Sequence, residues 1–206
     1  MFKGKLIVIE GIDACGKTTH SKKLVQAMNA TWLGFPARST FYGKLIDGWL
    51  KGEWSCSGGA DAAVFQAIQT CNRLECLPTM EHLLLNGENI VCDRYWPSGV
   101  VYGCADGLEK KLLMTLHQFF PQPDLCILLD TPVEVARARR SGAKLDKYES
   151  RGSAYYEAIR ESYLELFREQ LISKPWAWCC VNGDGAVDAV QAAIQQTVRR
   201  NLGDWV

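Results

Sequence analysis

The sequence predicts an α/β fold in which a five-stranded parallel sheet is covered by helices on both faces. Five short apolar runs rich in β-branched or aromatic residues have the length of strands, and segments with helical periodicity separate them. Strands that are apolar throughout and alternate with helices are typical of a parallel sheet in a three-layer arrangement. The expected strands are Lys5–Glu10, Thr31–Phe35, Asn89–Asp93, Leu125–Asp130 and Trp176–Val181.

Apolar residues at helical spacing predict the covering helices. Three such sets each fall on one helix face: Leu24, Val25 and Met28; Phe41, Leu45, Ile46, Trp49 and Leu50; and Val64, Phe65, Ile68 and Cys71. Gly87 suits the end of the helix before the third strand, and Pro132 suits the start of a helix after the fourth. Residues 51–59 and 141–147 are predicted to be irregular.

Length and charge limit the class of protein. The chain has 206 residues, which favours a single domain that spans residues 1–206. Of these residues, 48% are hydrophobic. Its 23 basic and 23 acidic residues give a net charge of zero, which argues against a nucleic-acid partner. We see neither a membrane span nor a targeting segment, and we therefore expect a cytoplasmic protein with no membrane partner.

The nine cysteines favour the same compartment. Their number is odd, no Cys-x-x-Cys pair occurs, and several lie inside apolar runs such as Leu125–Ile127. Free cysteine behaves as a small buried hydrophobe, so we expect reduced thiols in an intracellular protein.

Residues 11–18 form a complete Gly-x-x-x-x-Gly-Lys-Ser/Thr phosphate-binding loop, the P-loop. The expected strand before it and helix after it are the context that this motif requires. Gly11 and Gly16 let backbone amides turn toward a triphosphate, Lys17 reaches the β/γ-phosphates, and the Thr18 hydroxyl is a ligand for Mg²⁺. The motif therefore predicts ATP and Mg²⁺ as ligands.

Charged residues also follow the second and third strands. Because parallel strands deliver the loops after them to one sheet edge, Arg38 and Arg94 are expected to converge near the P-loop. The planar guanidinium of arginine suits phosphate oxygens. Asp93, at the end of the third strand, is a carboxylate placed to organise Mg²⁺ or its waters.

Three segments resemble the thymidylate kinase family, and the likeness extends from the P-loop to the last helix. They are Phe35-Pro36-Ala37-Arg38, Asn72-Arg73, and Asp93-Arg94-Tyr95 followed by Ser98-Gly99 and Tyr102. The resemblance implies a three-layer P-loop kinase fold with a short mobile lid at about 137–152. It also implies Mg²⁺-dependent transfer of the ATP γ-phosphoryl group to dTMP, which gives dTDP and ADP. A homodimer is the oligomeric state that the resemblance implies.

The resemblance assigns roles to individual residues. Arg38 and Arg94 grip the acceptor monophosphate, and Arg94 also acts in catalysis. Asp13 bonds the sugar 3′-hydroxyl from within the P-loop that holds ATP, and Tyr102 crowds the sugar 2′ position. Arg73 contacts a thymine carbonyl. The other residues placed on dTMP or ATP are Thr19, Phe35, Gln69, Asn72, Ser98, Gly99 and Tyr148.

Gln69 departs from the family pattern, which has an aromatic residue there to stack on thymine. Base–aromatic stacking contributes about 1–3 kcal/mol. Three alternatives remain open: Gln69 substitutes weakly, Phe65 one turn earlier takes over, or the base preference widens to include dUMP.

The predicted lid concentrates five cations between Arg137 and Lys147. Since the variable P-loop positions Ala14 and Cys15 carry no charge, the resemblance implies that lid cations stabilise the transferred phosphoryl group. Arg140 aligns best with the arginine that packs on adenine, and the candidates for the phosphoryl group are Arg137, Arg139 and Lys144. Asn182 and Asp184 either hold the adenine edge or form an ordinary turn.

Two other functions fit the P-loop. A deoxynucleoside kinase would need a carboxylate base near its hydroxyl acceptor, whereas Arg38 occupies the loop after the second strand. A P-loop ATPase switch protein would hydrolyse ATP without an acceptor. The sequence contains no Asn-Lys-x-Asp motif for guanine, so a GTPase is not expected.

Overall fold

The computed structural model describes residues 2–56, 60–140, 146–148, 150–174 and 177–203. Its five strands form one parallel sheet in the order β2-β3-β1-β4-β5. The strands are β1 (Leu6–Glu10), β2 (Thr31–Gly34), β3 (Ile90–Asp93), β4 (Leu125–Asp130) and β5 (Trp178–Asn182). All five predicted strands are confirmed, with ends that shift by at most two residues. Trp176, the predicted start of the last strand, lies outside the described residues.

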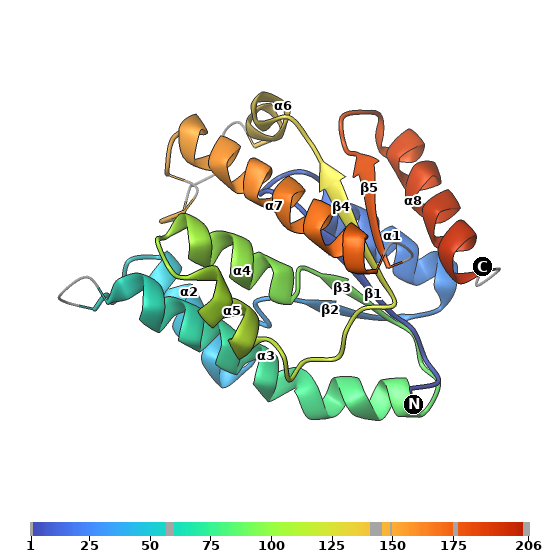
Figure 1. The fold of residues 1–206 in the computed structure, drawn as a ribbon, viewed down its shortest axis with the longest axis horizontal. Helices are drawn as coiled ribbons and strands as arrows, with labels where there is room; N and C mark the ends of the chain where they lie inside the picture. The colour runs from blue at the N-terminus through green and yellow to red at the C-terminus, as the bar shows by residue number, and fades with distance from the viewer. Residues whose placement is uncertain (1, 57–59, 141–145, 149, 175–176, 204–206) are drawn as a thin grey trace.

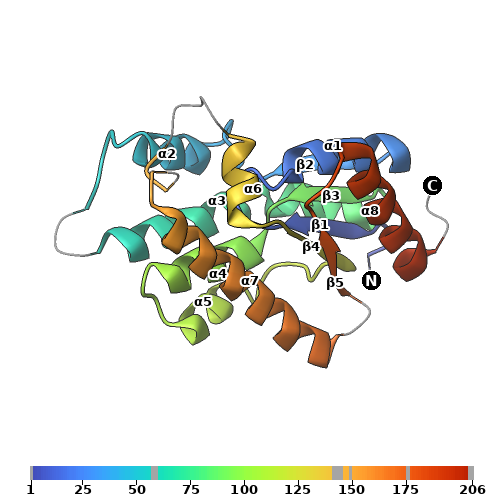
Figure 2. The same ribbon diagram turned by 90° about the horizontal axis from the view of Figure 1, so that it is seen from above.

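Helices cover both faces of the sheet, which confirms the three-layer prediction. Figures 1 and 2 show α1 and α8 on one face and α3, α4 and α7 on the other, with α2 against α3 and α5 against α4. The helices are α1 (Lys17–Met28), α2 (Phe41–Leu50), α3 (Asp61–Leu85), α4 (Trp96–Ala105), α5 (Lys110–Leu116), α6 (Val133–Ala138), α7 (Ser153–Ser173) and α8 (Val187–Leu202). In the described residues, no helix combines the length and apolar character needed to cross a bilayer.

The three central strands form the core. Every residue of β1 and β3 is buried, as are five of the six residues of β4. In the sheet register, Ile9 lies opposite both Asp93 and Ile127. The P-loop, which follows β1, therefore begins beside the carboxyl ends of β3 and β4, close to Asp93 at the end of β3.

Two expected apolar faces are partly wrong. Phe41, the first residue of α2, is 64% exposed, because the neighbouring elements that bury Ile46 and Trp49 do not extend over the beginning of this helix. On α3, Phe65 is buried as expected, but Val64, Ile68 and Cys71 are only partly buried. The buried face of α3 is largely polar, and it includes Gln66, Thr70, Asn72 and Arg73.

The predicted ends of two helices are confirmed. Gly87 has φ +90°, a left-handed conformation that glycine adopts readily, and it follows α3. Pro132 is the N-cap residue of α6. Within the predicted lid, residues 141–145 and 149 lie outside the described residues, and Lys144 is among them.

Candidate active site

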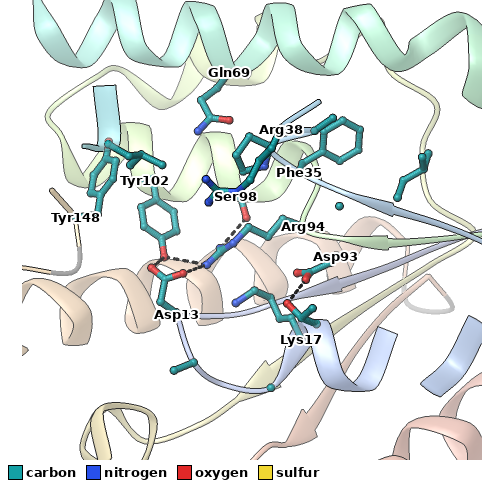
Figure 3. A pocket seen from close by; sticks show the side chains of 18 of the residues that line it. Asp13, Lys17, Phe35, Arg38, Gln69, Asp93, Arg94, Ser98, Tyr102 and Tyr148 are labelled. Carbon is teal, nitrogen blue, oxygen red and sulfur yellow. Dashed lines mark hydrogen bonds and ion pairs between the residues drawn. The ribbon is translucent and has the colours of Figure 1, made fainter. Parts of the chain in front are cut away.

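A cavity of about 1060 Å³ opens at the carboxyl edge of the sheet. Figure 3 shows side chains from the P-loop, from α3 and α4 and from the loops after β2 and β3 pointing into it. Single-ligand pockets are commonly about 300–1,000 Å³, so this cavity lies at the upper end of that range. The predicted residues that line it are Asp13, Gly16, Lys17, Thr18, Thr19, Phe35, Arg38, Gln69, Arg73, Asp93, Arg94, Ser98, Gly99, Tyr102, Arg139, Arg140 and Tyr148.

The P-loop adopts a conformation that explains its glycines. Gly11 has φ +143°, and a Cβ there would lie 2.7 Å from the Leu129 carbonyl oxygen. Gly16 has φ +108° and is the N-cap residue of α1. Lys17 is buried, and its ammonium donates to the Ile12 carbonyl at 2.6 Å. The positive end of the α1 dipole and the Lys17 ammonium therefore meet at the cavity, as an anion site requires.

The Thr18 hydroxyl donates a hydrogen bond to the Asp93 carboxylate, which joins the P-loop to the end of β3. These two oxygen donors fit Mg²⁺, which prefers oxygen ligands and commonly keeps one or two protein ligands besides phosphate and water. Among the described residues, no cluster of three or more His, Cys, Asp or Glu side chains suits a metal ion. The donor set therefore favours Mg²⁺ that arrives with a phosphate ligand.

Arg94 lies at the centre of the site. Its φ of +66° is uncommon for a residue other than glycine, and it turns the side chain from the end of β3 toward the P-loop. One terminal nitrogen pairs with the Asp13 carboxylate, and the other donates to the Ser98 hydroxyl at 3.1 Å; Figure 3 draws both contacts. The second nitrogen also donates to the Gly11 carbonyl at 3.2 Å and the Tyr163 hydroxyl at 3.2 Å. Burial alone would lower the pKa of Arg94, but its neighbours raise it well above the usual value.

Asp13 is held as a carboxylate by its surroundings. The Tyr102 and Tyr156 hydroxyls donate to it at 3.0 and 3.2 Å, and Arg94 pairs with it. Burial acts to raise the pKa of Asp13, but the positive charges of Arg94 and Lys17 outweigh burial and lower it to about 2. At neutral pH this side chain is therefore an ionised hydrogen-bond acceptor in the cavity wall.

Sequence reasoning missed a buried network beneath Arg94. The Glu10 carboxylate is fully buried and accepts hydrogen bonds from the Ser98 hydroxyl at 2.7 Å, the Tyr163 hydroxyl at 3.0 Å and the Tyr95 amide at 2.8 Å. Since the Ser98 and Tyr163 hydroxyls also contact Arg94, the network fixes the guanidinium from below. In the sequence, Glu10 is a carboxylate at the end of an otherwise apolar strand, and this could have pointed to the network. No local pattern marks Tyr156 or Tyr163.

The wall formed by α3 carries polar side chains. Arg73 is 3% exposed, and burial lowers its pKa to about 10. Its guanidinium donates to the Gln69 carbonyl at 3.2 Å and lies 6.0 Å from the centre of the Phe35 ring. Figure 3 shows Gln69 pointing from α3 into the cavity. This wall thus presents an amide and a buried guanidinium to a ligand.

Arg38 and Asn72 differ in their relation to the cavity. The Arg38 side chain is 59% exposed and pairs with Asp47 of α2. Asn72 does not line the cavity: its amide oxygen accepts from the Ala37 amide at 2.8 Å, and its amide nitrogen donates to the Thr40 hydroxyl at 2.8 Å. Asn72 therefore holds the loop that carries Arg38.

Some of the predicted lid residues line the cavity and others do not. The Arg139 guanidinium donates to the Cys15 carbonyl at 3.3 Å and the Gly183 carbonyl at 3.0 Å, so it joins α6 to the P-loop and to the loop after β5. Arg140 lines the cavity, whereas Arg137 is exposed and does not. Lys144 lies outside the described residues.

Three further predicted ligand residues do not line the cavity. Gly11, the first residue of the P-loop, is buried, and Asn182 and Asp184 are exposed. The Asp184 amide donates to the Asn182 side chain at 2.8 Å, which is a local turn. Gly185 and Val187 of the same segment line the cavity instead, and no motif identified them.

The chain matches known proteins along nearly its full length. Residues 9–194 match the family described as thymidylate kinase. Curated thymidylate kinases from Danio rerio and Homo sapiens are 32% and 31% identical to it, each over 94% of this chain and 89% of the relative. A solved thymidylate kinase structure from Candida albicans superposes with a TM-score of 0.83 at 25% identity, covering 98% of this chain and 94% of that one. The chain belongs to the thymidylate kinase family.

Proposed function

We propose that this chain transfers the γ-phosphoryl group of ATP to dTMP, giving dTDP and ADP. One observation carries the proposal: a single cavity brings the P-loop lysine, Lys17, together with Arg94 and Arg38 in a member of the thymidylate kinase family. Two polyanionic substrates need cations on both sides of the transferred group, and this arrangement supplies them.

The P-loop binds the donor triphosphate. Its backbone amides and the N-terminus of α1 face the phosphates, and Lys17 neutralises charge on the β/γ-phosphates. Thr18 and Asp93 would hold Mg²⁺. When bound, Mg²⁺ neutralises charge on the phosphate oxygens. Thr19, Gly185 and Val187 complete the donor side of the cavity.

The acceptor monophosphate binds to Arg94 and Arg38. Arg94 is already oriented by Asp13 and Ser98, so it needs little rearrangement, whereas the exposed Arg38 exchanges Asp47 for phosphate. The second pKa of a phosphate monoester is about 6, so the acceptor oxygen is ionised at neutral pH and needs no general base. Catalysis then consists of positioning and charge stabilisation.

Asp13 and Tyr102 place the sugar. Because the Asp13 pKa is about 2, its carboxylate accepts a hydrogen bond from the 3′-hydroxyl throughout the neutral range. The Tyr102 ring, fixed by its hydroxyl on Asp13, occupies the space beside the 2′ position and disfavours ribonucleotides. Arg73 contacts the base, and Gln69 in place of an aromatic residue leaves dUMP as a second acceptor.

Residues 137–152 act as a lid over ATP in this proposal. Arg139 already bridges the P-loop and the loop after β5, and Arg140 points its charge toward the same cavity. Of the lid candidates, Arg139 stabilises the transferred group in this proposal, and Arg140 packs on the adenine. Excluding water from the closed site suppresses hydrolysis of ATP.

The test is ADP formation from ATP and Mg²⁺ with dTMP, with thymidine, or with no acceptor. We expect dTMP to support turnover at least about 100-fold above the other two reactions, because Arg94 and Arg38 bind a phosphate that thymidine lacks. Faster turnover of thymidine would indicate a deoxynucleoside kinase. Equal turnover without an acceptor would indicate an ATPase.

We also infer a cytoplasmic homodimer. The nine cysteines are free thiols, and burial raises the pKa of Cys92 and Cys126, which suits a reducing compartment. The dimer follows from the family resemblance. Light scattering during gel filtration should give twice the monomer mass of 23.0 kDa, and a mass near 23.0 kDa would contradict the dimer.

A further inference from the structure

The structure places a buried carboxylate directly after α4, at the carbonyl end of the helix, where a negative charge is unfavourable. Asp106 is the C-cap residue of α4, and its side chain is 5% exposed. The carbonyl end of a helix carries partial negative charge, so an ionised carboxylate there is unfavourable unless nearby donors compensate it. Three donors converge on it: the Tyr148 hydroxyl, the Arg151 guanidinium at 2.5 Å and the Tyr155 hydroxyl at 3.2 Å.

Arg151 binds the rings as well as the carboxylate. Its guanidinium carbon lies 4.7 Å from the centre of the Tyr148 ring and 4.5 Å from that of Tyr155. The two rings are nearly parallel, with centres 6.1 Å apart. We call Asp106, Tyr148, Arg151 and Tyr155 the Asp106 clamp. It ties the segment before α7 to the end of α4, elements that are far apart in the sequence.

Only one of the two clamped tyrosines lines the cavity. Tyr148 is in the cavity wall, next to Tyr102, whose ring meets it edge-on at 5.5 Å, as Figure 3 shows. The other side of Tyr148 packs on Trp49 and Phe65, with ring centres 5.5 and 5.6 Å away. Tyr155 does not line the cavity.

The aromatic side chains of the base side differ from the family pattern. α3 presents Gln69 at the usual aromatic position, and Phe65, one turn earlier, also lines the cavity but is stacked on Trp49 with ring centres 3.9 Å apart. Trp49 thus occupies one face of Phe65. Tyr148 offers a further aromatic ring in the same cavity; it lies on a short segment outside any helix, and the bond to Asp106 fixes its hydroxyl end while neighbouring rings pack on its sides.

We propose that Asp106 is a positioning residue for the acceptor nucleotide, which holds the Tyr148 ring as an aromatic part of the base-pocket wall in a chain where α3 presents Gln69. The inference rests on the proposed function, because the base belongs to the acceptor monophosphate. Asp106 does not line the cavity, and it acts through Tyr148.

The test compares four variants in steady-state assays with dTMP and ATP. D106N replaces the charged acceptor of the Tyr148 hydrogen bond with a neutral amide and so weakens the bond, Y148F removes its donor, and D106N/Y148F combines two changes that act on one bond. We expect KM for dTMP to rise about 3- to 10-fold in each single variant and no further in the double variant, because one bond carries the effect. KM for ATP and kcat should stay within about 2-fold.

Y155F is the matched control. It also removes a hydroxyl from Asp106, but its ring lies outside the cavity, so KM for dTMP should remain at the wild-type value even where the melting temperature falls. If the clamp served folding only, all three single variants would lower the melting temperature and leave KM for dTMP unchanged, which would overturn the proposal. If D106N failed to fold, the comparison of KM for dTMP between Y148F and Y155F would distinguish the positioning role from a role in folding.

The wild-type rate separates the two levels of inference. Turnover of dTMP by the wild-type chain with unchanged KM in D106N and Y148F would reject the positioning role and keep the proposed function. A rise in KM for ATP equal to that for dTMP would also reject it. No turnover of dTMP by the wild-type chain would contradict both.

Discussion

The phosphate end and the base end of the cavity are built in different ways. At the phosphate end the charges already have partners: Arg94 pairs with Asp13, and Lys17 donates to a P-loop carbonyl. At the base end, buried polar atoms in the described part of the chain have no hydrogen-bond partner, including Arg73 Nε and Gln66 Oε1. The first end is organised before any ligand binds, whereas the second has hydrogen-bonding capacity left for one.

The difference follows from the origin of the residues. Phosphate contacts come from a backbone loop, a helix N-terminus and strand ends, which the topology of a parallel sheet brings together. Base contacts come from side chains of α3 and from Tyr148 within the proposed lid segment, and the sheet topology does not place them. Phosphate recognition is therefore a property of the fold, and base recognition is a property of this chain.

Lys17→Ala would break the phosphate end most severely. We expect kcat to fall about 1,000-fold, because the Lys17 charge acts directly on the transferred phosphoryl group. Steady-state kinetics with dTMP and ATP measures the loss. Lys23→Ala on the same helix is the control, since Lys23 is exposed, pairs with the exposed Asp188 and does not line the cavity. Retention of one tenth of the activity by Lys17→Ala would contradict the assigned role.

Arg94→Lys tests whether the preorganised guanidinium of Arg94 matters more than its positive charge. Lysine keeps the charge but cannot contact Asp13, Ser98 and the Gly11 carbonyl together. We expect kcat/KM for dTMP to fall about 100-fold. Arg160→Lys is the control, because Arg160 makes a comparable two-point contact with Asp130 but does not line the cavity. Equal losses in both variants would point to stability instead.

Gln69→Phe would sharpen the base end. A ring at this position should stack on thymine, and we expect KM for dTMP to fall about 5-fold, near the lower bound for stacking on one base. Gln69→Leu, which is apolar but cannot stack in the same way, should give little gain. Kinetics with dTMP and dUMP measures both, and an unchanged or higher KM in Gln69→Phe would show that Tyr148 already fills that role.

The smallest effect is a dependence of stability on pH at the base end. His117 is 2% exposed; burial and the charge of Arg73 lower its pKa to about 3. The unfolded chain, with an ordinary pKa of about 6.5, binds this proton first, so stability is full above pH 6.5 and falls as the pH drops toward 3. One proton corresponds to at most about 1.4 kcal/mol per pH unit.

Denaturant unfolding at pH 7.5 and 5.0 measures this slope. His117→Asn retains a donor for the Leu113 carbonyl, which His117 contacts at 2.6 Å, and removes the titration. The variant should lose less stability than the wild-type chain between the two pH values. An identical loss in both would assign the dependence to other groups; Asp13, whose pKa is about 2, contributes only below about pH 4.

The same contrast decides what could be predicted from the sequence. The strands were predictable because continuous apolar runs are needed in a sheet covered on both faces, and the P-loop because its chemistry needs glycines and a lysine at fixed spacing. The hydrogen bonds of Asp106 with Tyr148 and of Tyr156 with Asp13 join residues that are 42 and 143 positions apart, so no local pattern marks these side chains.

The helix faces show the same limit in the fold. Periodicity assigned an apolar face to α3, but the cavity wall requires Gln66 and Arg73 on the buried side. Phe41 fits the period of α2 and is nevertheless exposed, because periodicity cannot tell where a neighbouring element ends. These errors lie at the base end of the cavity and near it, where tertiary contacts decide.

The most direct test of the central claim is the amount of dTDP and ADP formed in one reaction of ATP, Mg²⁺ and dTMP, separated by anion-exchange chromatography. If the cavity binds both phosphates and excludes water, the two products form in equal amounts, and dUMP gives dUDP and ADP in the same ratio. ADP in clear excess over dTDP would contradict the claim, because it would mean that water reaches the phosphoryl group as readily as the acceptor.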